Sequence, residues 1–568
     1  MTDLTQRAQE WVDGDPDPLT QAELRQLIAG GDSEELAERM AGTLAFGTAG
    51  IRGVVEAGSN RMNRAMVIRT TAGLAKYLLA RTDPGNRLVA IGRDARLSSL
   101  SFMEDTIGVL TAAGFEVRYF ADPTPTPLVA YAGLTLGACA SIVITASHNP
   151  PRDNGYKVYA ANGAQIVSPT DIEIAEDIAT IGPANSVPRS DDPLRGPGVA
   201  AIDSEMFEAY LRDVASWLPD VVGNRDLRIV YTAMHGVGGR FVTAALRRFG
   251  FKNVQPVARQ YEPDGTFPTV SFPNPEEPGA LDLAHELAAA TDADLVIAND
   301  PDTDRLAISV PEPGGMWRPL TGNQIGSLLA EFLLEANSDG TVINSVVSSP
   351  LLGVIAQRHD TTFAQTLTGF KWVCNAAFDL EAQGKGEMIL GYEEALGYSV
   401  GTIVRDKDGI SAAVAFAMLA ADAAGDGATV LDRLGDLYRT YGVWVSTQVS
   451  IRREGAAGIE EIAAAMDALR NDPPTEIGGY PIVSVRDFLV DVESRPRYLG
   501  ATNLIELDLG ESGRVLARPS GTEPKLKVYV DLSGPFPESG DWLGAEHQLT
   551  DTAKAVAQEL GTWLAEQM

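Results

Sequence analysis

Three aspartates occupy alternate positions in residues 300–305, which read Asp-Pro-Asp-Thr-Asp-Arg. Apolar residues 295–298 and 306–308 flank this segment, and we predict both to be strands. In an extended chain alternate side chains point the same way, so the carboxylates should gather on one side. Without a cation they would repel one another, and oxygen ligands with room for water or phosphate suit Mg²⁺. The alternative interpretation is a solvated acidic loop.

A serine follows another apolar stretch. Residues 145–150 read Thr-Ala-Ser-His-Asn-Pro, directly after Ile-Val-Ile at 142–144. Ser147 therefore lies where a predicted strand gives way to a tight polar turn, a position that exposes a hydroxyl nucleophile. The alternative is that Ser, Asn and Pro are ordinary turn residues.

Two further segments predict anion binding. Arg305 directly follows the third aspartate, where a phosphate would bridge the guanidinium and a metal. Residues 518–527 combine cations, hydroxyls and a flexible glycine, and their backbone N–H groups can form an anion-binding nest. An ordinary surface turn is the alternative for residues 518–527.

Glycine-rich segments give weaker signals. Residues 47–53 hold three glycines and Arg52, and their spacing matches neither a Walker A loop nor a dinucleotide fingerprint. We interpret the glycines of residues 235–239 as structural packing. In residues 391–398 the adjacent carboxylates Glu393 and Glu394 can accept hydrogen bonds from sugar hydroxyls, or stand in the first turn of a helix. Lys407 follows in a charged segment that can approach this loop.

The composition narrows the class of protein. The net charge of −32 (45 basic against 77 acidic residues) argues against nucleic acid and anionic membranes as partners. The two cysteines suggest no disulfide framework. The N-terminus lacks the features of a signal peptide, and residues 410–424 fit a core helix better than a membrane span. We therefore expect a cytoplasmic protein without a membrane segment.

The order of elements predicts the fold class. Short β-branched stretches alternate with Ala- and Leu-rich helical patterns, which is typical of βαβ units. We predict three similar α/β domains with mixed sheets and a smaller α+β domain at the C-terminus. The predicted boundaries are 1–205 with the Ser147 segment, 206–320 with the aspartate segment, 321–440 with the Glu393 loop, and 441–568 with the Arg518 segment.

Together, these motifs resemble the α-D-phosphohexomutase superfamily of phosphoglucomutases and phosphomannomutases. The resemblance covers nearly the whole chain, in the same order, through residues 145–150, 154–157, 300–305, 393–397 and 518–522. It implies four domains around a central cleft, and reversible phosphoryl transfer on a sugar phosphate through a phosphoserine enzyme and a bisphosphorylated intermediate.

The resemblance also implies roles for individual residues. Ser147 would carry the phosphoryl group and join Asp300, Asp302 and Asp304 as a ligand of one Mg²⁺, with a sugar bisphosphate as activator. The implied catalytic residues are His148, Lys157, Arg52, Arg305 and Lys407; a lysine acting as general acid or base needs a lowered pKa. The implied substrate-binding residues are Gly369, Lys371, Glu393, Ala395, Arg518, Ser520, Gly521, Thr522 and Lys527.

One departure concerns the sugar. Many phosphoglucomutases have serine two residues after the sugar-binding glutamate, where this chain has Ala395, as in the branch with phosphopentomutases and bisphosphate synthases. We expect glucose 1-phosphate and glucose 6-phosphate as substrates, with mannose phosphates and pentose phosphates as alternatives. A phosphatase and a non-catalytic scaffold are further alternatives, but the intact motifs argue against the scaffold.

Overall fold

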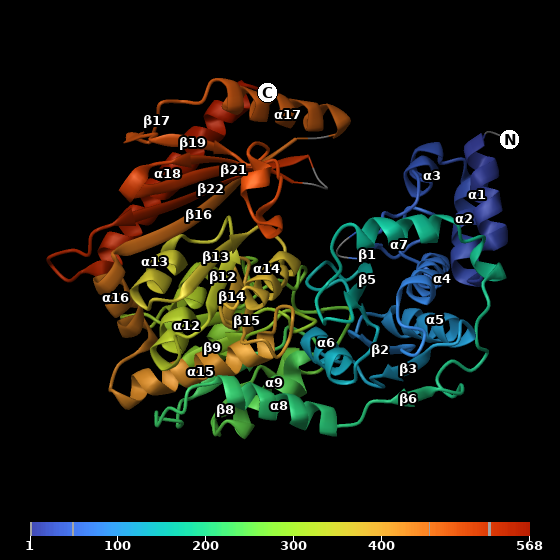
Figure 1. Ribbon diagram of the computed structural model, residues 1–568, viewed down its shortest axis with the longest axis horizontal. Coiled ribbons are helices and arrows are strands. Elements are labelled where there is room, and N and C mark those ends of the chain that lie inside the picture. Colours follow the sequence, from blue (N-terminus) through green and yellow to red (C-terminus); the bar gives the residue numbers. More distant parts are fainter. Residues whose placement is uncertain (1–2, 48–49, 454, 521–523) are drawn as a thin grey trace. The chain divides into compact units, whose positions relative to one another are not determined.

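The computed structural model describes residues 3–47, 50–453, 455–520 and 524–568 (Figure 1). The chain forms two units. Unit 1 comprises Met1–Leu320 and Gly397–Ala421, and unit 2 comprises Thr321–Leu396 and Asp422–Met568. The chain therefore passes from unit 1 to unit 2, returns to unit 1 and leaves it again.

The first sheet of unit 1 is mixed, with strand order β1-β5-β4-β2-β3-β6. Its core pairs, β2 with β3 and with β4, are parallel, whereas β5 is antiparallel to both β4 and β1. The strands are β1 (Ile51–Val54), β2 (Leu88–Arg93), β3 (Glu116–Tyr119), β4 (Ala140–Ile144), β5 (Asp153–Ala160) and β6 (Val199–Ala201). The helices around it are α4 (Arg64–Arg81), α5 (Ser99–Ala112), α6 (Thr126–Thr135), α7 (Thr170–Ala179) and the 3₁₀ turn η1 (Ala184–Ser186).

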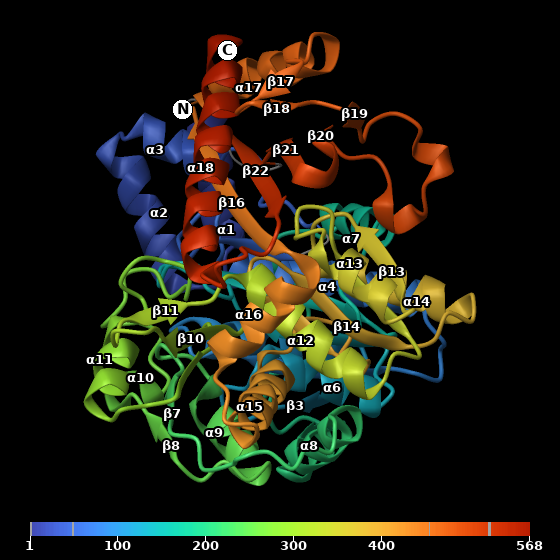
Figure 2. The same cartoon turned by 90° about the vertical axis from the view of Figure 1, so that its left-hand side faces the viewer.

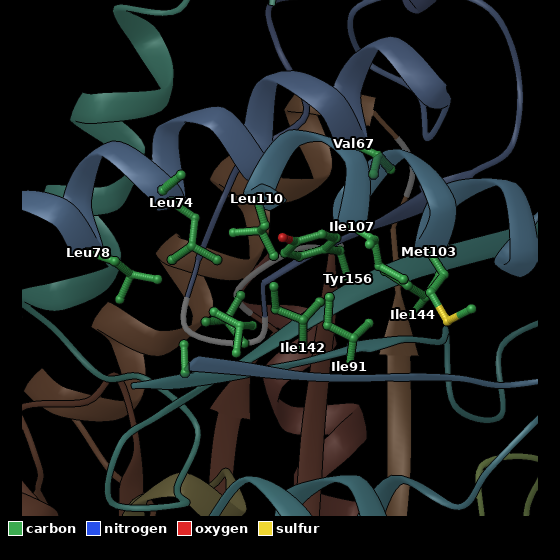
Figure 3. Packing of buried hydrophobic residues seen from close by; sticks show 14 of the residues in the cluster. Val67, Leu74, Leu78, Ile91, Met103, Ile107, Leu110, Ile142, Ile144 and Tyr156 are labelled. Atoms are coloured by element: carbon green, nitrogen blue, oxygen red, sulfur yellow. The ribbon is translucent and has the colours of Figure 1, made fainter. Parts of the chain in front are cut away.

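The core of this domain lies between the sheet and helices α4 and α5. Figure 3 shows Leu74 and Leu78 of α4 and Ile107 and Leu110 of α5 pointing toward Ile142 of β4. Every residue of β4 is buried, as expected for a strand with apolar residues on both faces. The rigid strand β4 ends directly before the Ser147 segment and fixes where that segment begins.

Three helices precede this domain: α1 (Asp3–Gly14), α2 (Pro18–Gly30) and α3 (Ser33–Arg39). They bury an apolar cluster of their own that includes Val12, Leu24 and Met40. The buried Arg39 joins them to the following segment, because it forms ion pairs with Glu23, Glu35 and Glu56. This helical extension was not predicted from the sequence.

The second sheet of unit 1 has strand order β11-β10-β9-β7-β8. Strand β9 is parallel to β7 and antiparallel to β10, so the aspartate segment connects two adjacent antiparallel strands. The strands are β7 (Ile229–Thr232), β8 (Val254–Pro256), β9 (Leu295–Ala298), β10 (Ala307–Pro311) and β11 (Trp317–Pro319). Unit 1 also contains α8 (Glu205–Trp217), α9 (Gly238–Arg248), α10 (Ala258–Tyr261), α11 (Asp282–Ala290), β15 (Gly397–Val400) and the first part of α15 (Gly409–Gly425).

In unit 2, the parallel strand pairs β12–β13 and β12–β14 form the first sheet. The strands are β12 (Thr341–Ser345), β13 (Thr362–Thr366) and β14 (Met388–Glu393), and the helices are α12 (Gly322–Ala336), α13 (Leu351–Arg358), α14 (Phe370–Ala382) and α16 (Val430–Tyr441). Helix α12 begins with a capping box, in which Thr321 and Gln324 exchange side-chain to backbone hydrogen bonds.

The second sheet of unit 2 has antiparallel strands in the order β16-β22-β21-β20-β19. Helix α18 lies along β16 and β22 (Figure 2). The main elements are β16 (Val443–Arg452), α17 (Gly455–Asn471), β19 (Ser484–Asp487), β20 (Ile505–Asp508), β21 (Gly513–Pro519), β22 (Lys525–Gly534) and α18 (Trp542–Glu566). The small elements are β17 (Glu476–Ile477), β18 (Tyr480–Pro481), η2 (Val492–Ser494), η3 (Arg497–Leu499) and η4 (Gly510–Ser512).

The observed elements confirm the predicted fold class: three α/β segments with mixed sheets precede an α+β segment. Cys139 and Cys374 are both buried and free of disulfide bonds. Within the described ranges, no single helix has the length and apolar character to cross a membrane. The bent pair α15 and α16 passes that test only when its helices are taken together, and residues 412–417 of α15 are fully buried.

Candidate active site

Ser147 lies in the turn between β4 and β5 with a left-handed backbone (φ 52°) and is 3% exposed. Its Oγ donates a hydrogen bond to Asp300 Oδ2 at 3.0 Å and lies 3.2 Å from His148 Nδ1. Thr145 Oγ1 accepts a hydrogen bond from the Ser147 amide. The structure thus brings the predicted nucleophile to the first aspartate of the predicted metal segment, 153 residues later in the chain.

A buried arginine that was not predicted from the sequence fixes the backbone of this turn. The Arg96 side chain is 1% exposed, and its guanidinium donates to the carbonyl oxygens of Ser147 (2.8 Å), Asn149 (2.6 Å), Pro150 (2.6 Å) and Asp153 (2.8 Å). These charge-assisted bonds offset the strain of a non-glycine residue with positive φ. Arg96 binds backbone carbonyls, and such contacts leave no pattern of residue types in the sequence. The polar segment after β2 was therefore the only sign of its role.

The aspartate segment is buried between β9 and β10. Asp300, Asp302 and Asp304 are each at most 1% exposed, and each offers an oxygen within 4.8 Å of the others. Gly236, in the segment predicted to serve packing, allows the close approach, because a Cβ there would lie 2.4 Å from Pro301 Cα. The prediction that the three carboxylates gather on one side agrees with this geometry.

The donors around the triad leave ligand positions for a cation. Asp302 Oδ2 accepts hydrogen bonds from Thr126 Oγ1 and Lys157 Nζ, both at 2.8 Å. Asp304 Oδ2 accepts from Lys157 Nζ at 3.0 Å. Within the described residues, Asp302 Oδ1 and Asp304 Oδ1 are buried without a hydrogen-bond partner. Two such carboxylate oxygens beside a third carboxylate fit a hard divalent cation, so the triad can hold a metal ion.

The charges in this cluster shift one another's pKa values. Burial and then the repulsion from Asp304 and Asp302 raise the pKa of Asp300. Burial also acts to raise the pKa of Asp302, but the adjacent Lys157 ammonium more than offsets it, and the pKa is lowered. Burial acts to lower the pKa of Lys157, but Asp302 and Asp304 outweigh burial, and its pKa is raised. The lowered pKa that a lysine needs as a general acid or base is thus not what these neighbours produce, because Asp302 and Asp304 outweigh the nearby cation Lys407.

The remaining predicted catalytic residues lie around the same cluster. Lys407 Nζ is 3.4 Å from Asp304 Oδ2 and 3.2 Å from Asp406 Oδ1. Arg305 Nε is 4.0 Å from Asp304 Oδ1. Arg52, on β1, donates to Asn149 Oδ1 at 3.0 Å.

His148 differs from the neighbouring cations because its side chain is uncharged. Burial first, and then the positive charges of Arg305 and Arg52, hold the pKa of His148 well below its usual range. The imidazole is therefore neutral at neutral pH, with Nδ1 facing the serine hydroxyl. A neutral imidazole in that position can accept a proton from Ser147 Oγ or return one.

The predicted sugar-binding residues belong to unit 2. Glu393 ends β14, and its Oε1 accepts a hydrogen bond from the Gly369 amide at 2.7 Å. Gly369 (φ 112°) precedes Lys371 in the first turn of α14, so the two predicted substrate loops are joined through Glu393. Ala395 follows Glu394, whose carboxylate accepts from two serine hydroxyls of the β12 end and the turn after it.

The predicted phosphate loop connects β21 and β22. Arg518 and Lys527 are directly paired across these strands, so their Cα atoms are neighbours. The Ser520 amide donates to the Lys525 carbonyl at 2.7 Å and begins the turn. The predicted binding residues Gly521 and Thr522 lie outside the described residues.

Comparison with protein families matches all four segments of the chain. Residues 43–184, 208–314 and 321–441 match the phosphoglucomutase/phosphomannomutase alpha/beta/alpha domains I, II and III, and residues 481–533 match the C-terminal domain of that family. The chain therefore belongs to the phosphoglucomutase/phosphomannomutase family, within the α-D-phosphohexomutase superfamily. It is an enzyme of the isomerase-type phosphotransferase class, with a phosphohexomutase-type function.

Individual relatives span most of the chain. A probable phosphomannomutase of Haemophilus influenzae is 40% identical and covers 85% of this chain and 96% of its own length. The phosphopentomutase of Mus musculus is 36% identical, with coverage of 98% and 94%. The crystal structure of a phosphomannomutase homologue from Thermus thermophilus has a TM-score of 0.68 at 22% identity, with coverage of 92% and 99%, and so shares the fold.

Proposed function

We propose that this enzyme is a Mg²⁺-dependent phosphoglucomutase that interconverts glucose 1-phosphate and glucose 6-phosphate. One observation carries the proposal: Ser147 Oγ lies 3.0 Å from Asp300 Oδ2 in a buried triad, and each of the other two aspartates has an oxygen without a hydrogen-bond partner among the residues that the structure describes. A serine placed there can carry a phosphoryl group beside a bound cation. When bound, Mg²⁺ would be held by Asp300, Asp302, Asp304 and the phosphoserine, and would offset charge on the transferring phosphoryl group.

The proposed reaction consists of two phosphoryl transfers. In the first, a hydroxyl of the sugar monophosphate attacks phosphoserine 147, the Oγ–P bond breaks and a sugar bisphosphate forms. After the intermediate turns around, the Ser147 hydroxyl attacks its other phosphate and regains the phosphoryl group. A sugar bisphosphate from solution would phosphorylate Ser147 at the start, which is the activator role.

Two groups are proposed to move the protons. His148, neutral and 3.2 Å from Ser147 Oγ, exchanges the serine proton. On the sugar side we propose Lys157, with Lys407 as the alternative, because both side chains lie against the triad. Asp302 and Asp304 raise the Lys157 pKa, and a bound Mg²⁺ would offset their charge and bring that pKa toward the lowered value that a general base needs. Arg305 and Arg52 would offset charge on the transferring phosphate.

The sugar and its second phosphate are assigned to unit 2. Glu393, fixed by the Gly369 amide, would accept hydrogen bonds from ring hydroxyls, and Lys371, two residues after Gly369, would also contact the substrate. Arg518, Ser520, Gly521, Thr522 and Lys527 would hold the phosphate that is not reacting. We also propose the domain boundaries after residues 205, 320 and 440.

Glucose is the first choice of sugar because the intermediate must bind in two orientations. In glucose the free ring hydroxyls are all equatorial, so each adjacent pair of hydroxyls lies near the plane of the ring. A single carboxylate can therefore accept hydrogen bonds from such a pair both before and after the intermediate turns around. A pentose phosphate is the second candidate. Ala395 provides no hydroxyl, which removes about 1 kcal/mol of sugar contact, and the mouse phosphopentomutase match spans 98% of the chain.

Initial rates on α-glucose 1-phosphate, mannose 1-phosphate and ribose 1-phosphate test the sugar assignment. The assay contains Mg²⁺ and a trace of hexose bisphosphate, and free phosphate is measured in parallel. The highest kcat/KM on glucose 1-phosphate is expected; a higher value on ribose 1-phosphate would select the second candidate. Stoichiometric release of free phosphate would indicate a phosphatase and contradict a mutase.

Ser147→Ala tests the mechanism separately from the sugar. The variant should lose phosphorylation and all measurable turnover on every substrate, because the phosphoryl carrier is gone. Ser101→Ala is the matched control: the Ser101 hydroxyl, in the first turn of α5, donates to the Ser98 carbonyl, and its loss should leave turnover unchanged. Near-normal turnover of the Ser147 variant would exclude the phosphoserine mechanism.

A further inference from the structure

A cavity of about 430 Å³ lies outside the catalytic cluster, between the helical extension and the first domain of unit 1. Its walls come from α1, from the start of α4 and from residues 181–184. Helix α1 is fixed there, because a Cβ on Gly14 would lie 2.7 Å from Pro183 Cβ and the Asp13 carbonyl accepts a hydrogen bond from Asn185. The volume falls in the range of small-molecule sites.

Two arginines of the cavity wall lack a countercharge. In the part of the chain that the structure describes, neither Arg7 nor Arg69 forms an ion pair. Arg69 is half-buried, and burial lowers its pKa without a neighbouring carboxylate to offset it. By contrast, Arg39 in the same extension pairs with three glutamates. In a chain with net charge −32, two arginines at one cavity without ion pairs indicate a place for an anion.

Two buried hydrogen-bond donors of the cavity wall also lack an acceptor in the part of the chain that the structure describes. Arg69 Nε and Trp11 Nε1 are buried without a partner among the described residues. Four acceptors nearby are already used: the Met40 carbonyl accepts from Arg7, the Ile181 carbonyl from Arg69, and the two Asp15 carboxylate oxygens accept from residues 17 and 20. A ligand that satisfies this wall must bring acceptors of its own.

Part of the wall is apolar. The Arg69 guanidinium lies 5.8 Å from the centre of the Trp11 ring, and Met40, Ala65 and Ile181 add apolar surface. Glu10 is the exposed acid on the wall. Burial raises the pKa of Asp15, which disfavours a negative charge at the other acid.

We propose that this cavity binds a small organic anion, with a carboxylate, sulfonate or phosphate group against Arg69 and an apolar or aromatic body against Trp11. The α1 wall precedes residue 43, where the match to family domain I begins, so the site uses a part of this chain outside that match. The proposal does not depend on the proposed function. A ligand there would join α1 to α4 and stabilise the folded enzyme by an amount that grows with the logarithm of the ligand concentration once this exceeds Kd.

The test uses two fluorescent probes on the full chain. 8-Anilinonaphthalene-1-sulfonate has the anionic group, and N-phenyl-1-naphthylamine has the same rings without it. The wild type should bind the sulfonate at least about tenfold more tightly than the neutral probe. Arg69→Met should remove that preference, whereas Lys76→Met, an exposed cation of the same helix, should keep it.

Gly182→Leu tests the location. Gly182 lines the cavity, and a Cβ there meets only Ser186 Oγ, at 3.5 Å, so the added side chain is tolerated by the backbone while it reduces the volume. It should weaken both probes. Circular dichroism checks that each variant is folded, and Arg69→Gln replaces Arg69→Met if that variant is not.

Three results would overturn the proposal. The first is a wild-type preference for the sulfonate of less than about twofold, which needs no variant. The second is an equal preference in the folded Arg69 variant and the wild type. The third is unchanged binding of both probes in Gly182→Leu. Turnover should be unchanged in the Arg69 and Gly182 variants, because neither residue touches the catalytic cluster.

Discussion

Replacing Arg96 with methionine should lower kcat, although Arg96 acts only through the backbone of the Ser147 turn. Methionine fills most of the same volume but cannot donate to the four carbonyls that hold the Ser147 turn. It also leaves the Asp94 carboxylate, 2% exposed, without its ion-pair partner. The substitution therefore removes both the hydrogen bonds to the turn and the positive charge beside the buried Asp94.

The magnitude follows from these two losses. Breaking a buried ion pair by removing one partner costs about 3–5 kcal/mol of folding free energy. The four carbonyls are buried or half-buried, so the loss of their donor adds to this cost and the range is a lower bound. Ser147 then relaxes from its left-handed backbone, and a displacement of about 1 Å at the nucleophile lowers kcat by about a hundredfold.

Urea unfolding, kcat and the stoichiometry of phosphoserine measure the separate effects. Arg93→Met is the matched control: Arg93 is half-buried and donates to the Asp94 and Ala121 carbonyls, outside the turn. It should change kcat by less than about threefold. Arg96→Lys should restore the charge beside Asp94 and therefore stability, but little of kcat, because one ammonium cannot reach four carbonyls. An Arg96→Met enzyme with reduced stability and normal kcat would refute positioning through this residue.

Three further outcomes are expected. Chelation with EDTA should abolish turnover and Mg²⁺ should restore it; full activity after exhaustive chelation would contradict the metal assignment of the aspartate triad. Arg518→Ala should raise KM far more than it slows phosphorylation of Ser147 by the bisphosphate, and an equal loss in both assays would argue against a distal phosphate site. Burial and then the hydrogen bond to Asp213 raise the pKa of Tyr131 to about 12. Unfolded tyrosines ionise near pH 10, so this contribution to stability is intact below that pH and is lost as pH rises toward 12. The urea midpoint should fall less over this range in Tyr131→Phe, and an unchanged slope would exclude the effect.

Local pattern predicted the elements well. The apolar stretch before Ser147 is the buried strand β4, and the segments around the three aspartates are β9 and β10. Strands and helices of this kind carry their periodicity in the sequence. The helical extension was missed even though Asp17 and Pro18 mark the start of α2 as an N-cap and first-turn proline.

Contacts between residues far apart in the chain could not be predicted from the sequence. The types of Ser147 and Asp300 predicted phosphoryl transfer and metal binding, but their 3.0 Å contact depends on how two sheets pack. Lys157 shows the limit most clearly. Its pKa depends on which charges fold against it, and the two aspartates beside it are 145 and 147 residues away.

The return of the chain to unit 1 has a consequence for the order of synthesis. Tyr159 and Tyr210 are buried, and their hydroxyls donate to Asp406 and Asp408 of the returning segment. Until residues 397–421 leave the ribosome, these phenols have no such acceptors and Lys407 is absent from the triad. A nascent chain of 320 residues therefore holds nearly all of unit 1 in an incomplete form, and the catalytic cluster gains its last member, Lys407, only after most of the first sheet of unit 2 has also been made.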